Sequence, residues 1–187
     1  QQLEAQLDTL QPDDILILAG SIPASLAQTT YERILARLEG RDIRAVVDAT
    51  RDLLVNVLRY KPFLIKPNNH ELSEIAGVKL TNDNEIVTAA RMMQAKGARN
   101  VLVSMAGDGA LLLDEQGGVH RIGCPKGKVV NSVGAGDSMV AGFVAGYQQS
   151  GGDYAAALKL GTACGSATAF SLGLATKADI DKLLKTM

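Results

Sequence analysis

The chain has 187 residues, of which 47% are hydrophobic, so it can bury a core as one domain spanning 1–187. Its net charge is −1 with the basic residues scattered, and it has no run of 18 apolar residues and no secretory signal, so nucleic acid and membrane are not expected as partners. The two cysteines, Cys124 and Cys164, lack metal-ligand spacing and indicate reduced thiols in a cytoplasmic protein.

Short apolar runs alternate with amphipathic stretches along the chain. The first ten residues have the pattern of the end of a helix. Runs typical of buried strands cover residues 14–20, 44–49, 63–67 and 100–106. Residues 110–115 and 118–123 flank Gln116-Gly117 and predict a hairpin. Helical spacing or capping residues predict helices over 28–40, 53–58, 82–96 and 153–170, one directly after Gly136, and a last one capped by Thr176 and Asp179. The helix over 82–96 is expected to begin with a capping box formed by Asn82 and Glu85.

This alternation is typical of an α/β protein with a parallel sheet covered on both faces. Right-handed crossovers place the carboxyl ends of parallel strands at one edge, where open α/β sheets bind their ligands. Ser21, Asp48, Lys66, Asn68 and Ser104 all fall at such strand ends. The sequence therefore predicts one ligand site along this edge.

The segment NSVGAGDSMVAGFV contains a turn of small residues, Gly134, Ala135 and Gly136, followed directly by Asp137 and an apolar helical pattern. Glycines before a helix let the backbone approach a ligand, and the helix N-terminus adds about half a positive charge, so together they favour an anion such as phosphate. The simpler interpretation is a tight turn in which Asp137 caps the first helical turn.

The same segment resembles, position for position, the C-terminal motif of the PfkB (ribokinase-like) family of sugar kinases. The resemblance implies a ribokinase-like three-layer α/β/α fold with a mostly parallel central sheet. It also implies that Asp137 contacts the sugar and is the catalytic base. The N–H groups of Gly134, Ala135 and Gly136 would form an anion hole for the phosphoryl group, with Gly136 also contacting ATP.

The segment KPNNHE, residues 66–71, follows the third strand. Asn68 and Glu71 have the spacing of a capping box, which needs no ligand. The resemblance implies in addition that Asn68 and Glu71 help to hold Mg²⁺, largely through water, and that Lys66 and Asn68 contact the nucleotide. Both interpretations stay open, since a capped helix start is also where phosphates bind.

Two further turns match the family. In SMAGDGA the resemblance assigns Ser104, Gly107 and Gly109 to ATP, although Ala106 stands where the family usually has glycine and Gly107 is at a variable position. In GSIP it places Ser21 near the sugar phosphate. Ordinary turns are the simpler interpretation of both segments.

Within the family the chain is most similar to the 1-phosphofructokinases, which implies fructose 1-phosphate and ATP as substrates. Tagatose-6-phosphate kinase and 6-phosphofructokinase stay open, as does a non-catalytic nucleotide-binding module. A dinucleotide-binding fold is disfavoured, because no GxGxxG follows the first strand. The resemblance covers only the C-terminal, nucleotide-binding portion, with the N-terminal part and lid missing. We expect little activity from this portion alone, and a homodimer is one assembly that the resemblance allows at full length.

Overall fold

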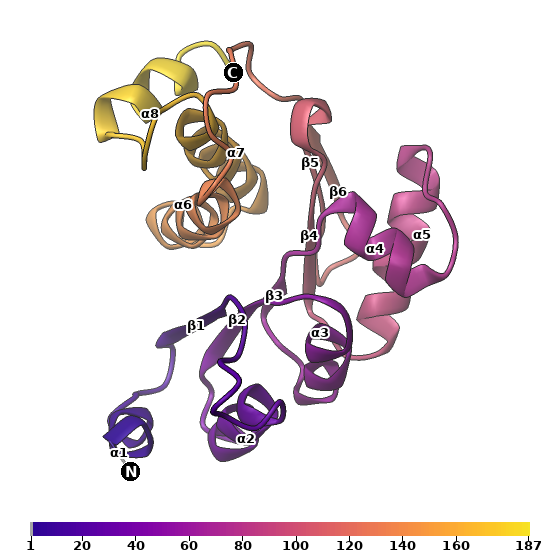
Figure 1. Cartoon of the computed structure of the whole chain (residues 1–187), viewed down its shortest axis with the longest axis vertical. Helices are drawn as coiled ribbons and strands as arrows, with labels where there is room; N and C mark the ends of the chain where they lie inside the picture. The colour runs from indigo at the N-terminus through magenta and orange to yellow at the C-terminus, as the bar shows by residue number, and fades with distance from the viewer. Residues whose placement is uncertain (1) are drawn as a thin grey trace. The chain divides into compact units, whose positions relative to one another are not determined.

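The computed structural model describes residues 2–187 (Figure 1). They form two compact units, residues 2–102 and Val103–Met187, called here the first and second unit. The boundary lies within strand β4, Asn100–Ser104. None of the helices in residues 2–187 is both long and apolar enough to cross a membrane.

The first unit alternates helices with parallel strands. Its elements are α1 (Gln2–Asp8), β1 (Ile15–Ala19), α2 (Thr30–Leu38), β2 (Arg44–Asp48), α3 (Arg51–Val57), the 3₁₀ turn η1 (Leu58–Tyr60), β3 (Leu64–Ile65), α4 (Asn69–Ala76), α5 (Asp83–Ala95) and the start of β4. β1 pairs with β2, β2 with β3, and β3 with β4, always in parallel. The buried strand residues are apolar on both faces in β2 and β3, as expected of a parallel sheet.

The strands of this unit follow one another in sequence order, so right-handed crossovers put their connecting helices on the same face. Consecutive helices accordingly contact each other, α2 with α3, α3 with α4 and α4 with α5 (Figure 1). The amphipathic spacing of α2 buries Tyr31, Ile34, Leu35 and Leu38. The carboxyl end of each strand is followed by a loop, and the candidate ligand residues of this unit lie at these strand ends.

Two predicted helix starts can be compared directly with the structure. Asn68 caps α4 with the complete capping box, closed by Glu71. Asn82 also caps α5 and accepts the N–H of Glu85, but the return bond is different from the expected one. Glu85 accepts from the N–H and hydroxyl of Thr81, one residue earlier, so the predicted reciprocal box at Asn82 is wrong.

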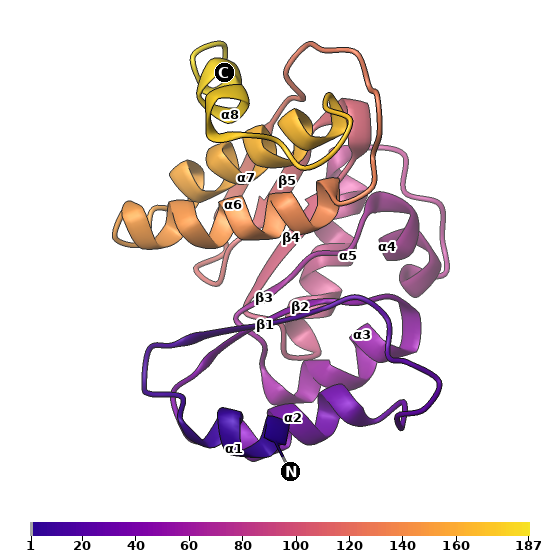
Figure 2. The same ribbon diagram turned by 60° about the vertical axis from the view of Figure 1, so that its left-hand side comes forward.

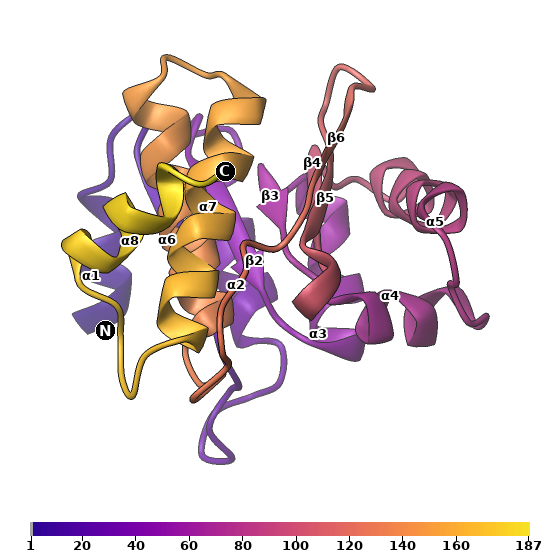
Figure 3. The ribbon, with the colours of Figure 1, turned by 90° about the horizontal axis from the view of Figure 1, so that it is seen from above.

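The second unit contains the end of β4, the 3₁₀ turn η2 (Ala106–Asp108), β5 (Ala110–Leu113), β6 (Val119–Ile122), α6 (Ala135–Gln149), α7 (Tyr154–Ala169) and α8 (Lys177–Leu184). β5 and β6 form the predicted antiparallel hairpin, which is seen end to end in Figure 3. Thr176 and Asp179 form the predicted capping box of α8. α7 packs on β5 and β6 and also contacts α8.

Helices α6 and α7 run side by side along most of their length (Figure 2). Glycines on both helices allow this approach. A Cβ added to Gly161 would lie 2.9 Å from the carbonyl oxygen of Met139, and one added to Gly165 would lie 3.0 Å from that of Ala135. Gly142 and Gly146 of α6 are as close to α7. The backbone that follows the glycine turn is therefore fixed against a second helix.

Candidate active site

The predicted glycine turn lies at the N-terminus of α6, in the second unit. Gly134 is the residue before the first helical position and has φ 78°. A Cβ at this position would also lie 3.1 Å from Cδ2 of Leu174. The exposed Leu174 side chain could move aside, but the positive φ would strain any other residue, so the turn requires glycine.

The turn leaves backbone donors unpaired. The N–H of Ala135 donates to the carbonyl of Ser132 at 3.2 Å. The N–H of Ser138 donates to the carbonyl of Gly134 at 2.9 Å. The N–H groups of Gly136 and Asp137 have no acceptor within residues 2–187. Together with the positive end of a 15-residue helix, these donors can bind an anion. Ala135 differs from its neighbours, because its N–H is already engaged.

The carboxylate of Asp137 lies in the first turn of α6 and is exposed. It makes no capping hydrogen bond, and the part of the chain that the structure describes offers it no other hydrogen-bond partner. By contrast, Glu71 and Asp179 each occupy the third position of a helix, and each accepts a hydrogen bond from the backbone N–H of the N-cap residue of that helix. The geometry therefore argues against a capping role for Asp137 and leaves both carboxylate oxygens available to accept a proton.

The turn is held from its other side by the end of α7. The carbonyl of Ala169 accepts the N–H groups of Val130 and Asn131 at 2.8 and 3.2 Å. The side chain of Asn131 accepts the N–H of Val133 at 3.0 Å and donates to the carbonyl of Leu172 at 3.3 Å. The segment before Asp137 is thus fixed by hydrogen bonds at several points.

The loop after β4 contains the residues predicted to contact the nucleotide. Gly109 has φ 89°, and an added Cβ would lie within 2.7 Å of the nitrogen of Cys124, so no other residue fits. Gly107 has open space around it and no such requirement. Ala106 adopts φ 47°, the left-handed conformation that glycine takes without strain. The substitution of alanine at this position therefore keeps the loop in a glycine-like shape. Ser104, just before the loop, is partly exposed.

In the first unit, the strand ends come together as predicted. The N–H of Gly20, directly before Ser21, donates to the carbonyl of Asp48 at 3.1 Å. Nζ of Lys66 lies 3.2 Å from Oδ2 of Asp48, with the two side chains 7% and 18% exposed. Ser21 itself is exposed. At the carboxyl ends of β1, β2 and β3, the turn that contains Ser21 therefore lies next to the mostly buried ion pair of Asp48 and Lys66.

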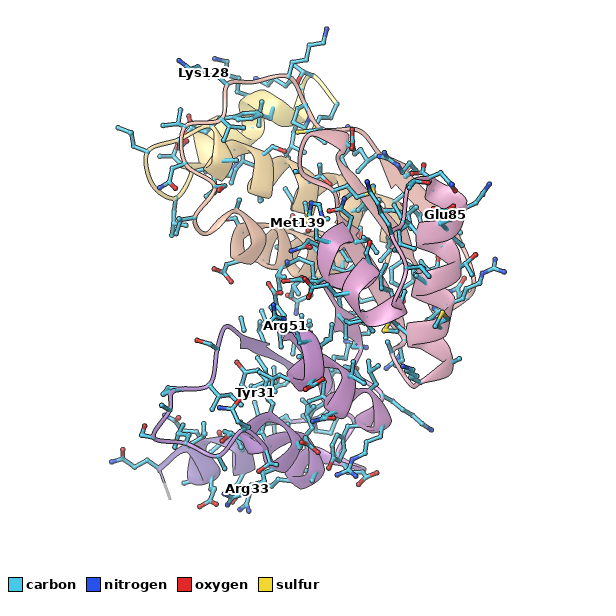
Figure 4. All side chains as sticks on the ribbon, turned by 45° about the vertical axis from the view of Figure 1, so that its right-hand side comes forward. Tyr31, Arg33, Arg51, Glu85, Lys128 and Met139 are labelled. Atoms are coloured by element: carbon cyan, nitrogen blue, oxygen red, sulfur yellow. The ribbon has the colours of Figure 1, made fainter. Side chains whose placement is uncertain are left out.

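The hydroxyl of Tyr31, labelled in Figure 4, fixes the same turn from α2. It donates to the carbonyl of Ala19 at 2.8 Å, and the carbonyl of Gly20 lies 3.2 Å away. Burial raises the pKa of Tyr31, with a further contribution from the charge of Asp48. The phenol therefore stays protonated as a donor.

Asn68 and Glu71 can be tested as a magnesium site. Oδ1 of Asn68 accepts the N–H groups of His70 and Glu71, so both of its lone pairs are used. Glu71 uses only Oε2, which accepts the N–H of Asn68 at 2.8 Å, and this leaves Oε1 for a metal-bound water. Across residues 2–187, no group of three or more His, Cys, Asp and Glu side chains is placed to hold a metal by itself. The residues fit a hydrated ion whose remaining ligands are water and phosphate.

Sequence reasoning missed several of these partners. The Lys66–Asp48 ion pair, the Tyr31 hydroxyl bond and a bond between Ser138 and Thr168 all join residues far apart in sequence. The strand-end position of Asp48 and Lys66 was a signal for the first. No local pattern marks the other two.

Comparisons with known proteins agree with the fold and with the family resemblance. Residues 1–181 match the family described as pfkB family carbohydrate kinase. The 1-phosphofructokinase of Bacillus subtilis is 46% identical over 179 residues, which are 96% of this chain and 58% of that protein. The D-tagatose-1-phosphate kinase of Bacillus licheniformis is 35% identical over 187 residues, 100% of this chain and 60% of that protein.

Among solved structures, phosphofructokinase-2 from Escherichia coli in complex with substrates and products superposes with a TM-score of 0.90 at 28% identity, covering 99% of this chain and 61% of that one. The chain therefore spans about 60% of the length of the relatives that it matches. The expected ribokinase-like α/β fold is confirmed. The chain belongs to the pfkB family of carbohydrate kinases.

Proposed function

We propose that this chain is the C-terminal, nucleotide-binding portion of an ATP-dependent sugar-phosphate kinase that converts fructose 1-phosphate to fructose 1,6-bisphosphate. The observation that supports it most is the start of α6, where the exposed carboxylate of Asp137 has no hydrogen-bond partner in the described chain and adjoins free N–H groups. The names of the relatives from the two Bacillus species support a phosphorylated ketose as the substrate.

In this reaction the O6 hydroxyl of the sugar attacks the γ-phosphorus of ATP. Its proton passes to the carboxylate of Asp137, the bond from the γ-phosphorus to its bridging oxygen breaks, and ADP leaves. The N–H groups of Gly136 and Asp137, with that of Gly134, stabilise the charge on the transferred phosphoryl group. Removal of one such donor typically costs about 10²- to 10³-fold in rate. Ala135 contributes by its place in the turn, because its own N–H is engaged.

The remaining predicted residues bind and orient the substrates. Lys66 and Asn68 contact the nucleotide, and the loop with Ser104, Gly107 and Gly109 lies against it. Ser21 contacts the sugar phosphate. Phosphoryl transfer depends chiefly on such positioning and on charge stabilisation.

Mg²⁺ would neutralise phosphate charge on the nucleotide. Glu71 is the residue that would hold it, through a water bound to Oε1. Asn68 supports this arrangement by closing the capping box that fixes the Glu71 side chain, and its amide nitrogen remains a donor for phosphate oxygen.

An ADP-release assay with the chain in its full-length protein tests the proposal. Fructose 1-phosphate, fructose 6-phosphate, tagatose 6-phosphate and tagatose 1-phosphate would be compared, each with ATP and Mg²⁺. We expect the highest kcat/KM with fructose 1-phosphate and a loss of about 10²- to 10⁴-fold in kcat for Asp137→Asn. Asp181→Asn is the matched control, because Asp181 makes only an exposed ion pair with Lys177.

Preference for another of these sugars would keep the mechanism and change the substrate. Binding of ATP without transfer to any of them would favour the non-catalytic nucleotide-binding module. Activity that survives Asp137→Asn would refute the assignment of the base.

A further inference from the structure

Thr168 lies near the C-terminal end of α7 and is 1% exposed. Its hydroxyl oxygen lies 2.9 Å from the hydroxyl oxygen of Ser138 in the first turn of α6. The same oxygen accepts the N–H of Ala175, in the connection to α8, at 3.2 Å. One buried hydroxyl thus joins three segments of the second unit.

The hydrogen bonds of this hydroxyl can be counted. A threonine hydroxyl has one donor and two acceptor sites. The N–H of Ala175 occupies one acceptor site, and the bond to Ser138 uses either the donor or the second acceptor. Valine at this position would keep the shape of the side chain, but it would leave the hydroxyl of Ser138 and the N–H of Ala175 without this partner.

The bond reaches the glycine turn directly. Ser138 follows Asp137 in the chain, and its N–H bonds to the carbonyl of Gly134 at 2.9 Å. A Cβ built on Gly134 would lie 4.0 Å from the methyl carbon of Thr168, so this side chain also lies beside the turn. The rotation of the first turn of α6 about its axis decides where the carboxylate of Asp137 points.

We propose that Thr168 is a positioning residue for Asp137, acting through Ser138. This inference rests on the proposed function, in which Asp137 is the base. Thr168 fixes the first turn of α6 so that the carboxylate and the free N–H groups of Gly136 and Asp137 keep their mutual geometry. It does not contact the substrates. Its loss therefore slows the chemical step more than it weakens substrate binding, because small misplacements of reacting groups are costly in rate.

The test uses Thr168→Val and Thr168→Ser in the full-length protein, with steady-state kinetics for fructose 1-phosphate and ATP. We expect Thr168→Val to lower kcat by about tenfold while both KM values change by less than about twofold. Thr168→Ser keeps the hydroxyl and should recover most of kcat.

Thr162→Val is a matched control. Thr162 lies on the same helix and is equally buried, but its hydroxyl has no hydrogen-bond partner within the described residues. This variant should keep kcat within about twofold, since it removes no hydrogen bond. A difference between the two valine variants cannot then be attributed to burial or to helix propensity.

Ser138→Ala gives a second approach if Thr168→Val folds poorly. It should lower kcat in the same direction, and the double variant with Thr168→Val should lose less than the product of the two single losses. A fold-loss of kcat in the double variant equal to the product of the two single fold-losses would show that Thr168 does not act through Ser138.

The outcomes separate the two proposals. A wild-type protein that phosphorylates none of the four sugars overturns the proposed function and this inference with it. A wild-type protein that is active and inactivated by Asp137→Asn, with Thr168→Val as active as Thr162→Val, overturns only the positioning role. A loss of kcat that Thr168→Ser does not recover, and that accompanies a lower thermal midpoint, identifies a structural residue and also overturns it.

Discussion

The ammonium nitrogen of Lys66 lies 3.2 Å from a carboxylate oxygen of Asp48, where the carboxyl ends of β3 and β2 meet. Both side chains are largely withdrawn from water, so the carboxylate of Asp48 compensates the charge of the Lys66 ammonium. Removing one partner of a buried pair leaves an uncompensated charge and costs about 3–5 kcal/mol. Because Asp48 is 18% exposed, we expect Asp48→Asn to lower the free energy of unfolding by about 2–3 kcal/mol, measured in urea.

The matched control for this pair is Lys177→Met, which breaks the exposed ion pair with Asp181. That change should cost less than about 1 kcal/mol. The double variant Asp48→Asn with Lys66→Met should lose less stability than the sum of its single variants, because no charge stays unpaired. Additive losses would mean that the ion pair is not coupled.

In the loop after β4, substitutions of the small residues are expected to have opposite effects on stability. Ala106→Gly should raise the free energy of unfolding by about 0.5 kcal/mol, since relief of a left-handed alanine outweighs the greater entropy of glycine in the unfolded chain. Gly109→Ala should lower it by more than about 2 kcal/mol, because the new Cβ meets the backbone at Gly123 and Cys124. Gly107→Ala is the control and should be nearly neutral. A destabilised Ala106→Gly variant would contradict the conformation of the loop.

The hairpin turn predicts a pH-dependent contribution to stability. Burial would raise the pKa of Asp114, but hydrogen bonds from His120 and from the N–H groups of Gly118 and Gln116 outweigh it and hold the pKa below its usual value. A carboxyl whose folded pKa is lowered stabilises the fold above its unfolded pKa, near about 4, and this stabilisation is lost as pH falls through the folded pKa.

Asp114→Asn should therefore lower the free energy of unfolding by about 1–2 kcal/mol at neutral pH. The difference from wild type should shrink as pH falls below about 4, because the wild-type carboxyl then takes up its proton. Urea titrations at neutral and acidic pH measure it. A difference that stays constant over this range would show that shape, and not charge, accounts for the loss.

The contact between α6 and α7 predicts a steric effect. Gly161→Ala places a Cβ 2.9 Å from the carbonyl of Met139 and 3.1 Å from the nitrogen of Phe143, so the helices must separate. We expect a loss of about 1–3 kcal/mol, seen as a lower thermal midpoint. Gly123→Ala, which has nothing within 4 Å of its new Cβ, should leave the midpoint nearly unchanged. Equal effects of the two substitutions would contradict the close approach.

The sequence predicted well the features that depend on neighbours along the chain. The capping boxes of Asn68 with Glu71 and of Thr176 with Asp179 involve residues three positions apart, and both are present. The prediction at Asn82 failed by one residue, because Glu85 reaches the N–H of Thr81 instead. The pattern fixes which residue types meet there, while the entry angle of the chain decides which N–H is within reach.

Features that join distant segments could not be predicted in the same way. Thr168 and Ser138 are thirty residues apart, and no periodicity links a hydroxyl on one helix to a hydroxyl on another. The left-handed conformation of Ala106 is a similar case, because alanine does not normally indicate it. Such contacts follow from how two helices or a loop pack, which is decided by shape across the whole unit.

The donors at the start of α6 belong to the main chain, and this has a consequence for inheritance. A codon change at Gly136 or Asp137 alters the side chain, but every amino acid except proline still provides the backbone N–H group. Random mutation at these two positions can therefore remove the carboxylate far more easily than it can remove the backbone donors. If Asp137 is the base, as proposed, a lineage that stopped catalysing would be expected to lose the acid first and to keep the N–H groups of the turn for many generations.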